Sequence, residues 1–362
     1  MNLMKTIRKS FSARLSLQVV MIASMVFGVV FSVLFFSSKR IVRQEAESHA
    51  GSELSGTVYQ IEDILHQVEA AAKNMEWLVR DRLGNPDSLY AVTRMMMRTN
   101  PHVIGSCVAF EPGFYAEKGE LFAPYSYLTE EGEVKDRNLG YAAYNYHAKE
   151  WYATPKRLDR NYWSEPYFDE GGGDRVMSTY SHVLRNGEGK MFGILTADIS
   201  LDHLSGLVNG IKPYPGSYTL MISRLGNYLV HPKPERILHE TIYTATSDMT
   251  DRSVTILGDA MIRGEEGMHE LQNDDTLSYV FYKPVEGTEW SVAVVCPYRD
   301  VFAPLDRLTL VVVSVFLLGL LALLFFCVWR IRRTSHPLKL FSEVPRGERR
   351  PGGTAARDSH QR

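Results

Sequence analysis

Two long uncharged runs near the ends of the chain constrain its fold more than any other feature. The first covers residues 15–38 and the second residues 308–328, and neither contains Asp, Glu, Lys or Arg. At about 1.5 Å of rise per residue, a helix of either length crosses a hydrocarbon core of roughly 30 Å. A cleaved signal peptide, the alternative for the first run, has an apolar core of only about 7–15 residues. We therefore predict transmembrane helices at residues 15–38 and 308–329.

The charges that flank these runs indicate how the chain is oriented. Residues 1–14 carry four basic residues and no acid, and Trp329 is followed by arginines at positions 330, 332 and 333. Basic residues near membrane spans concentrate on the cytoplasmic side. Lys39 and Arg40 oppose this orientation, but long domains translocate largely regardless of charge. Both termini are predicted to be cytoplasmic and residues 39–307 extracytoplasmic, in a two-pass protein embedded in a lipid bilayer.

Residues 39–99 are predicted to form one long stalk helix. Apolar residues recur at alternating intervals of four and three at Leu54, Val58, Ile61, Leu65, Val68, Ala72, Met75 and Val79, and residues 54–79 contain no proline. This spacing places one apolar stripe along a helix. The stripe either packs on the core of its own chain or, in part, meets a second copy in a homodimer. The opposite, solvated face is predicted to carry Glu62, Asp63, Glu69 and Lys73.

From residue 100 onward the pattern changes to short segments rich in β-branched and aromatic residues. Turn signals such as EGGGD and RNGEG separate them, which is typical of antiparallel sheets. The order of strands and helices then repeats, which predicts two related modules at residues 100–208 and 209–307. The predicted fold class is α+β, with two tandem antiparallel-sheet modules on one long N-terminal helix, flanked by two transmembrane helices.

The segment from residue 144 to residue 198 concentrates aromatic side chains around one cation and one anion. The predicted ligand-binding residues are Tyr144, Lys149, Trp151, Tyr152, Tyr167 and Asp198. Aromatic faces and a carboxylate suit an ammonium group, and a lysine suits a carboxylate. Taken singly, the aromatic residues could belong to the core, and Asp198 could cap a helix that begins near Leu201. Together they predict a pocket for a small molecule.

This arrangement of helix, modules and membrane spans resembles the double Cache sensor domains of bacterial transmembrane receptors, in which two PAS-like modules stack on one long helix. Amino-acid-sensing members carry a motif of tyrosine, four residues, arginine, one residue, tryptophan and tyrosine, followed by a tyrosine and an aspartate. Five of the six residues above match in type, and Lys149 stands at the arginine position.

The resemblance implies a division of labour among these six residues. The basic residue, the first tyrosine and the tryptophan would hold a ligand carboxylate, while the aspartate and the other tyrosines would hold its ammonium group. Lysine lacks the planar fork that binds a carboxylate through two hydrogen bonds. An amino acid therefore remains one predicted ligand class, and an amine without an α-carboxylate is the other.

Other classes of function find little support in the sequence. HExxH, GxSxG and GKS/T motifs are missing, and the three cysteines have no metal-ligand spacing, so neither an enzyme nor a metal or cofactor site is predicted. A net charge of −2 gives no signal for nucleic-acid binding. The prediction is a receptor that signals through its second membrane helix. The alternative is an anchored protein that binds a partner through its long helix.

The segment after the second span resembles the start of a HAMP linker at residues 330–343, where Pro337 precedes a leucine-containing helix. Residues 344–362 are rich in Arg, Gly and Pro and are predicted to be disordered. A second linker helix and an output domain do not follow. The expectation is a truncated receptor, whose intact form would be a kinase, chemoreceptor, cyclase or serine phosphatase.

Overall fold

The chain divides into two compact units, and a computed structural model describes residues 11–244, 252–273 and 276–340. One unit comprises Ile41–Ala303, and the other comprises Met1–Arg40 together with Pro304–Arg362. The predictions for residues 1–10 and for the tail from residue 341 onward lie outside the described residues.

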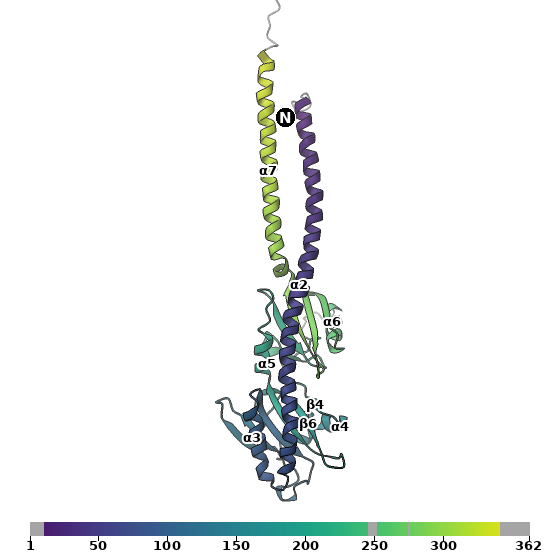
Figure 1. Ribbon diagram of the computed structural model, residues 1–362, viewed down its shortest axis with the longest axis vertical. Coiled ribbons are helices and arrows are strands. Elements are labelled where there is room, and N and C mark those ends of the chain that lie inside the picture. Colours follow the sequence, from purple (N-terminus) through teal and green to yellow (C-terminus); the bar gives the residue numbers. More distant parts are fainter. Residues whose placement is uncertain (1–10, 245–251, 274–275, 341–362) are drawn as a thin grey trace, which may run out of the picture. The chain divides into compact units, whose positions relative to one another are not determined.

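Two long helices carry the predicted membrane spans (Figure 1). Helix α2 comprises Phe11–Asp81 and helix α7 comprises Tyr298–Leu340. Each contains an apolar stretch long enough to cross a membrane, within Gln18–Asp81 and Tyr298–Trp329. Large apolar side chains are exposed on both stretches, and the rings of Phe27 and Phe316 stack with their centroids 3.6 Å apart. Exposed, uncharged helix surface of this length suits contact with lipid.

Helix α2 also supplies the stalk of the Ile41–Ala303 unit. Seven of the eight predicted stripe residues are buried, each at most 2% exposed, and Met75 is half-buried. The stripe therefore packs within the core of its own chain. Two residues predicted for the solvated face instead contact other parts of the chain. The Glu62 carboxylate accepts a hydrogen bond from the Glu286 amide, and the Glu69 carboxylate accepts one from the Trp163 indole.

The stalk is not one helix over residues 39–99. Helix α2 ends at Asp81, the short helix η1 (Pro86–Ser88) follows, and helix α3 (Leu89–Thr99) returns the chain to the sheet. Gly84 and Pro86 explain the break. Glycine weakens a helix, and proline has no backbone N–H group to donate to the helical hydrogen bonds.

The first module is built on a seven-stranded antiparallel sheet. Its order is β3-β2-β1-β7-β6-β4, and β5 pairs separately with β6. The strands are β1 (Val103–Phe110), β2 (Pro124–Leu128), β3 (Val134–Asn138), β4 (Tyr162–Trp163), β5 (Tyr167–Phe168), β6 (Val176–Arg185) and β7 (Met191–Ser200). The short helices are η2 (Ala116–Lys118), η3 (Tyr146–Ala148) and α4 (Glu150–Leu158). Strands β6 and β7 are buried along almost their whole length, so they form the centre of the module.

Helix α5 (Leu201–Val208) leads into a second, five-stranded antiparallel sheet of order β10-β11-β12-β8-β9. Its strands are β8 (Tyr218–Ile222), β9 (Tyr228–Val230), β10 (Gly267–Asn273), β11 (Thr276–Val285) and β12 (Trp290–Pro297), with helices η4 (Pro234–Arg236) and α6 (Arg252–Ile262). Strand β12 is followed directly by α7. The predicted fold class, two tandem PAS-like antiparallel modules with a long N-terminal helix, is confirmed.

Candidate ligand-binding site

The six predicted site residues all lie in the first module. Asp198 is on the central strand β7, Tyr167 is on β5, and Tyr144 to Tyr152 surround the start of α4. Tyr144, Trp151 and Tyr152 belong to one buried aromatic cluster that also contains Tyr125, and Tyr167 packs against that cluster. The fold therefore gathers the predicted aromatic side chains in one region.

Asp198 is held in the sheet by a short polar chain. Thr179 lies opposite it on β6, and the Thr179 hydroxyl donates a 2.8 Å hydrogen bond to the Asp198 carboxylate. The Tyr167 hydroxyl lies 2.6 Å from the Thr179 hydroxyl, so Tyr167 and Asp198 share this threonine. The proposed capping role does not apply, because Ser200 caps helix α5 by accepting a hydrogen bond from the Asp202 amide.

A glycine on the neighbouring strand β1 makes room for the Asp198 carboxylate. Gly105 is the register partner of Asp198. A Cβ atom at Gly105 would collide with both the Asp198 carboxylate and the Tyr125 hydroxyl. That hydroxyl is buried beside the Asp198 carboxylate and stabilises its ionised form.

A second buried acid, Asp169, completes the site and was not predicted. It lies in the turn between β5 and β6 and is 2% exposed. Its carboxylate accepts a 2.5 Å hydrogen bond from the Tyr144 hydroxyl and a 2.7 Å hydrogen bond from the Gly173 amide. The Lys149 ammonium lies 4.8 Å from the centroid of the Tyr144 ring. The predicted cation therefore contacts the tyrosine that donates a hydrogen bond to Asp169.

The turn that carries Asp169 is a hairpin loop anchored to its surroundings. The Arg137 guanidinium donates hydrogen bonds of 2.5 and 3.0 Å to the carbonyl oxygens of Gly171 and Gly172. The Tyr141 hydroxyl donates a third, of 2.9 Å, to the Gly171 carbonyl. These bonds fix the turn, and with it the position of the Asp169 carboxylate.

Burial governs the electrostatics of the two acids. It raises the pKa of Asp198 to about 7, with repulsion from Asp169 adding to the effect and the Thr179 hydrogen bond opposing it. Burial likewise raises the pKa of Asp169, against hydrogen bonds from Tyr144 and Gly173 and the charge of Lys149. Within the described part of the chain, no cationic side chain forms an ion pair with either acid. Two buried acids without a paired cation favour an ammonium-bearing ligand.

The remaining predicted residues, Tyr152 and Trp151, belong to the buried aromatic cluster. The Tyr152 hydroxyl donates a 2.7 Å hydrogen bond to Glu111, which also accepts one from Lys156, so this hydroxyl is already paired. The Trp151 ring stacks on Tyr146 with the centroids 6.2 Å apart. Both side chains are buried and extend the aromatic surface of the site.

Part of the chain is similar in sequence to known sensor proteins. Residues 89–206 match the profile of the methyl-accepting chemotaxis protein-like, first PDC sensor domain. The chain is 26% identical over 170 residues to the methyl-accepting chemotaxis protein PscA of Pseudomonas syringae pv. tomato, covering 46% of this chain and 25% of that protein. It is 23% identical over 211 residues to PctB of Pseudomonas aeruginosa, covering 57% of this chain and 32% of PctB.

Two solved structures share the fold of most of this chain. Methyl-accepting chemotaxis protein X has a TM-score of 0.60 at 23% identity, with 71% of this chain and 99% of that chain covered. The ligand-binding domain of PctB in complex with L-Gln has a TM-score of 0.52 at 18% identity, with 73% of this chain and 98% of that chain covered. The chain thus spans a third or less of the length of the full-length relatives but nearly all of these solved sensor domains.

Proposed function

Because the outer region has the tandem Cache-type fold of periplasmic sensor domains, we propose that this chain is a membrane-anchored sensor whose first module binds a small ammonium compound. The observation that carries the proposal is the pair of buried acids, Asp169 and Asp198, which have no ion-pair partner among the described residues. A ligand ammonium placed between them would supply the missing charge. The Tyr125 hydroxyl and the Tyr144 ring would complete its surroundings.

The ligand class follows from the charges around the site. Two acids and one lysine give a surplus of negative charge, which suits an amine or the ammonium end of an amino acid. PctB, a relative of this chain, was solved with L-Gln bound. For an amino acid, Lys149 is the group that would bind the carboxylate, through a single point charge. An amine needs no such contact, so both classes belong in the same ligand screen.

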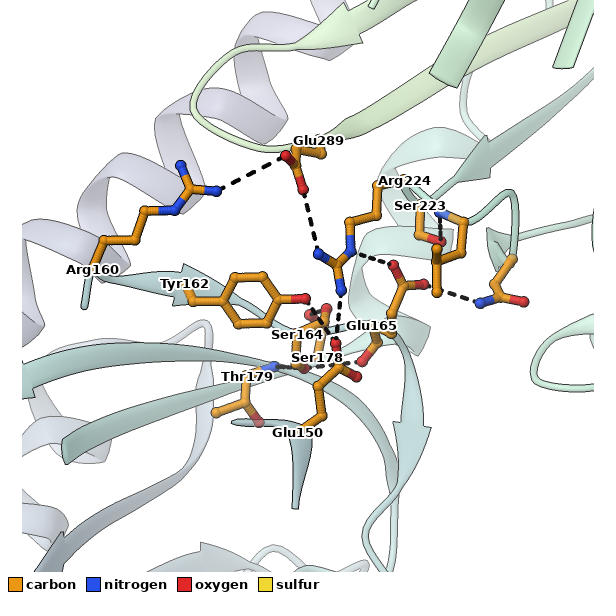
Figure 2. Close-up of polar contacts among 12 residues, drawn as sticks. Glu150, Arg160, Tyr162, Ser164, Glu165, Ser178, Thr179, Ser223, Arg224 and Glu289 are labelled. Carbon is orange, nitrogen blue, oxygen red and sulfur yellow. Dashed lines mark hydrogen bonds and ion pairs between the residues drawn. The ribbon is translucent and has the colours of Figure 1, made fainter. Parts of the chain in front are cut away.

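A chain of hydrogen bonds supports a route from this site to the second module. The Thr179 amide donates a 3.0 Å bond to the Ser164 hydroxyl, which donates a 2.9 Å bond to the Glu165 carbonyl. The Glu165 carboxylate then accepts a 3.2 Å bond from Arg224, which follows strand β8 of the second sheet (Figure 2). Since Thr179 also binds Asp198, a change in the charge of Asp198 would act directly on this chain.

Signalling through the second membrane helix is the proposed outcome. Strand β12 pairs with β8 and continues into α7, so the second sheet and this helix are covalently linked. A ligand can shift the helix only through different affinities for two conformations. Helix shifts in such switches are about 1–2 Å. We further propose that residues 39–307 are extracytoplasmic and that the chain resides in a bacterial inner membrane.

The test is thermal unfolding of the full chain in detergent micelles against a panel of amines, amino acids and simple carboxylates. A ligand at about 100 times its Kd should stabilise the folded state by about 2.7 kcal/mol. The stabilisation should disappear in Asp198→Asn and in Asp169→Asn, and it should persist in Asp202→Asn, which neutralises an exposed acid on α5. No stabilisation by any ammonium compound would contradict the proposal.

A further inference from the structure

A cavity lies in the Ile41–Ala303 unit, apart from the two buried acids. Its volume is about 400 Å³, within the range of roughly 300–1,000 Å³ that is usual for small-molecule sites. It is bordered by Glu69 on α2, by strand β4, by Arg224 after β8 and by the turn between β11 and β12. Neither Asp169 nor Asp198 lines it. We refer to it as the inter-sheet cavity.

Four aromatic side chains form the walls of the inter-sheet cavity. Tyr162, Trp163, Tyr180 and Trp290 all line it, and each is between 4% and 7% exposed. The Trp163 ring lies 5.5 Å from the Trp290 ring and 5.1 Å from the Tyr180 ring, measured between centroids. The Trp163 indole is fixed by its 2.8 Å hydrogen bond to Glu69. Aromatic faces carry negative potential and attract cations.

The charged groups of the inter-sheet cavity are predominantly acidic. Arg224 is shared by three carboxylates, at 3.2 Å from Glu150, 3.2 Å from Glu165 and 3.7 Å from Glu289 (Figure 2). Arg160 reaches only Glu289, at 4.0 Å. The lining carries three carboxylates, on Glu69, Glu165 and Glu289, and two guanidiniums, on Arg160 and Arg224. Glu150, which pairs with Arg224, adds a fourth carboxylate beside them, so acids outnumber cations by two. The local field therefore favours a positively charged guest over an anionic one.

The chain itself already places a cation against one of these walls. The Arg224 guanidinium carbon lies 5.1 Å from the centroid of the Tyr162 ring. The Tyr162 hydroxyl in turn donates a 2.7 Å hydrogen bond to Glu150, which is one of the three acids around Arg224 (Figure 2). The surroundings thus combine aromatic faces with carboxylates, which is the chemistry that recognises quaternary and primary ammonium groups.

We propose that the inter-sheet cavity is a second binding site, which takes a small organic cation. It uses acids and aromatic rings distinct from those of the first site, so it does not depend on the function proposed for Asp169 and Asp198. Because its lining comes from α2 and from both sheets, a bound cation would contact both modules at once.

The probe is tetramethylammonium chloride, titrated into the full chain in detergent micelles by calorimetry at constant ionic strength. The expected result is saturable binding that becomes about tenfold weaker in Glu69→Gln, equivalent to about 1.4 kcal/mol. The glutamine oxygen can still accept the Trp163 hydrogen bond, which keeps the cavity wall in place. Glu188→Gln removes the same charge from an exposed turn and serves as the matched control, with unchanged binding expected.

Two further measurements separate this site from the first one. Tert-butanol, a neutral molecule of similar shape, should not bind, because the inferred recognition depends on charge. Asp169→Asn alters the first site but no member of the hydrogen-bonded chain from Thr179 to Arg224, so it should leave tetramethylammonium binding intact. The proposal is overturned by an absence of saturable binding, by equal binding of tert-butanol, or by binding that Glu69→Gln leaves unchanged. Binding lost in Asp169→Asn would assign the cation to the first site and would also overturn the proposal.

Discussion

The buried Asp198 carboxyl should make the unliganded protein less stable as the pH rises. The pKa of this group is about 7 in the folded protein, against an ordinary value of 3.8. Between these two values the unfolded chain is ionised while the folded chain retains a proton. The unfolded state therefore binds fewer protons, and the free energy of unfolding falls with increasing pH across this window.

The size of the effect follows from the two pKa values. Each tenfold difference in proton affinity corresponds to about 1.4 kcal/mol, so the destabilisation reaches about 4 kcal/mol at and above pH 7. Asp198→Asn removes the titrating group but retains an oxygen that accepts the Thr179 hydrogen bond. The variant should resemble the wild type in stability near pH 4 and exceed it by about 4 kcal/mol near pH 8. For a folded region of this size, that corresponds to a Tm difference of about 10 °C.

The assay is thermal unfolding of both proteins in detergent micelles, followed by circular dichroism from pH 4 to pH 8 without ligand. The difference in Tm between variant and wild type reports Asp198 together with its repulsion of Asp169, because the other titrating groups contribute to both proteins. Asp202→Asn, at an exposed position on α5, should show a difference that is small and independent of pH. A Tm difference that stays flat for Asp198→Asn, or a wild type that is the more stable protein at pH 8, would refute the reasoning.

Three further predictions follow from burial and packing. Gly105→Ala should destabilise the fold by about 1–3 kcal/mol in urea unfolding and abolish the ligand response, because its Cβ atom would collide with Asp198 and Tyr125. Gly206→Ala, in open space on α5, should be neutral or slightly stabilising. Equal effects of the two substitutions would contradict the steric argument. Arg224→Ala should lower the free energy of unfolding by about 1–3 kcal/mol in the same assay, because it leaves the buried carboxylate of Glu165 without its ion pair. An unchanged free energy of unfolding would show that the Arg224–Glu165 pair contributes nothing. The Cys107 and Cys296 thiols are 1% and 0% exposed, and burial raises the pKa of each. Both should react with Ellman's reagent only after unfolding. Rapid labelling of the folded protein would be inconsistent with their burial.

The fold could be predicted because its signals are local. Uncharged runs, a stripe repeating every three to four residues and short alternating segments are each contained within one stretch of chain. The end of α2 at Asp81 was also encoded locally, since Gly84 and Pro86 stand where the helix breaks, but the predicted stalk ran past them. Gly84 and Pro86 are therefore a local signal for the end of the helix, and a stalk predicted over residues 39–99 ignores it.

The second acid of the site could not be predicted in the same way. Asp169 begins a glycine-rich turn, and such a residue is ordinarily solvated. Its burial depends on Tyr144, 25 residues away, and on Arg137, which anchors the turn from strand β3. The roles of Glu62 and Glu69 likewise depend on contacts with distant strands and turns. Partners that only the tertiary fold brings together leave no periodic signal in the sequence.

The most direct test of the central claim is calorimetry of the tightest ammonium ligand from the thermal screen, bound to the full chain at several pH values. If the ligand pairs with ionised Asp198, affinity should rise towards tenfold per pH unit below pH 7 and level off above it, with a proton released on binding at low pH. Asp198→Asn should bind weakly and without this pH dependence. Affinity that is independent of pH in the wild type, or retained in Asp198→Asn, would contradict the account.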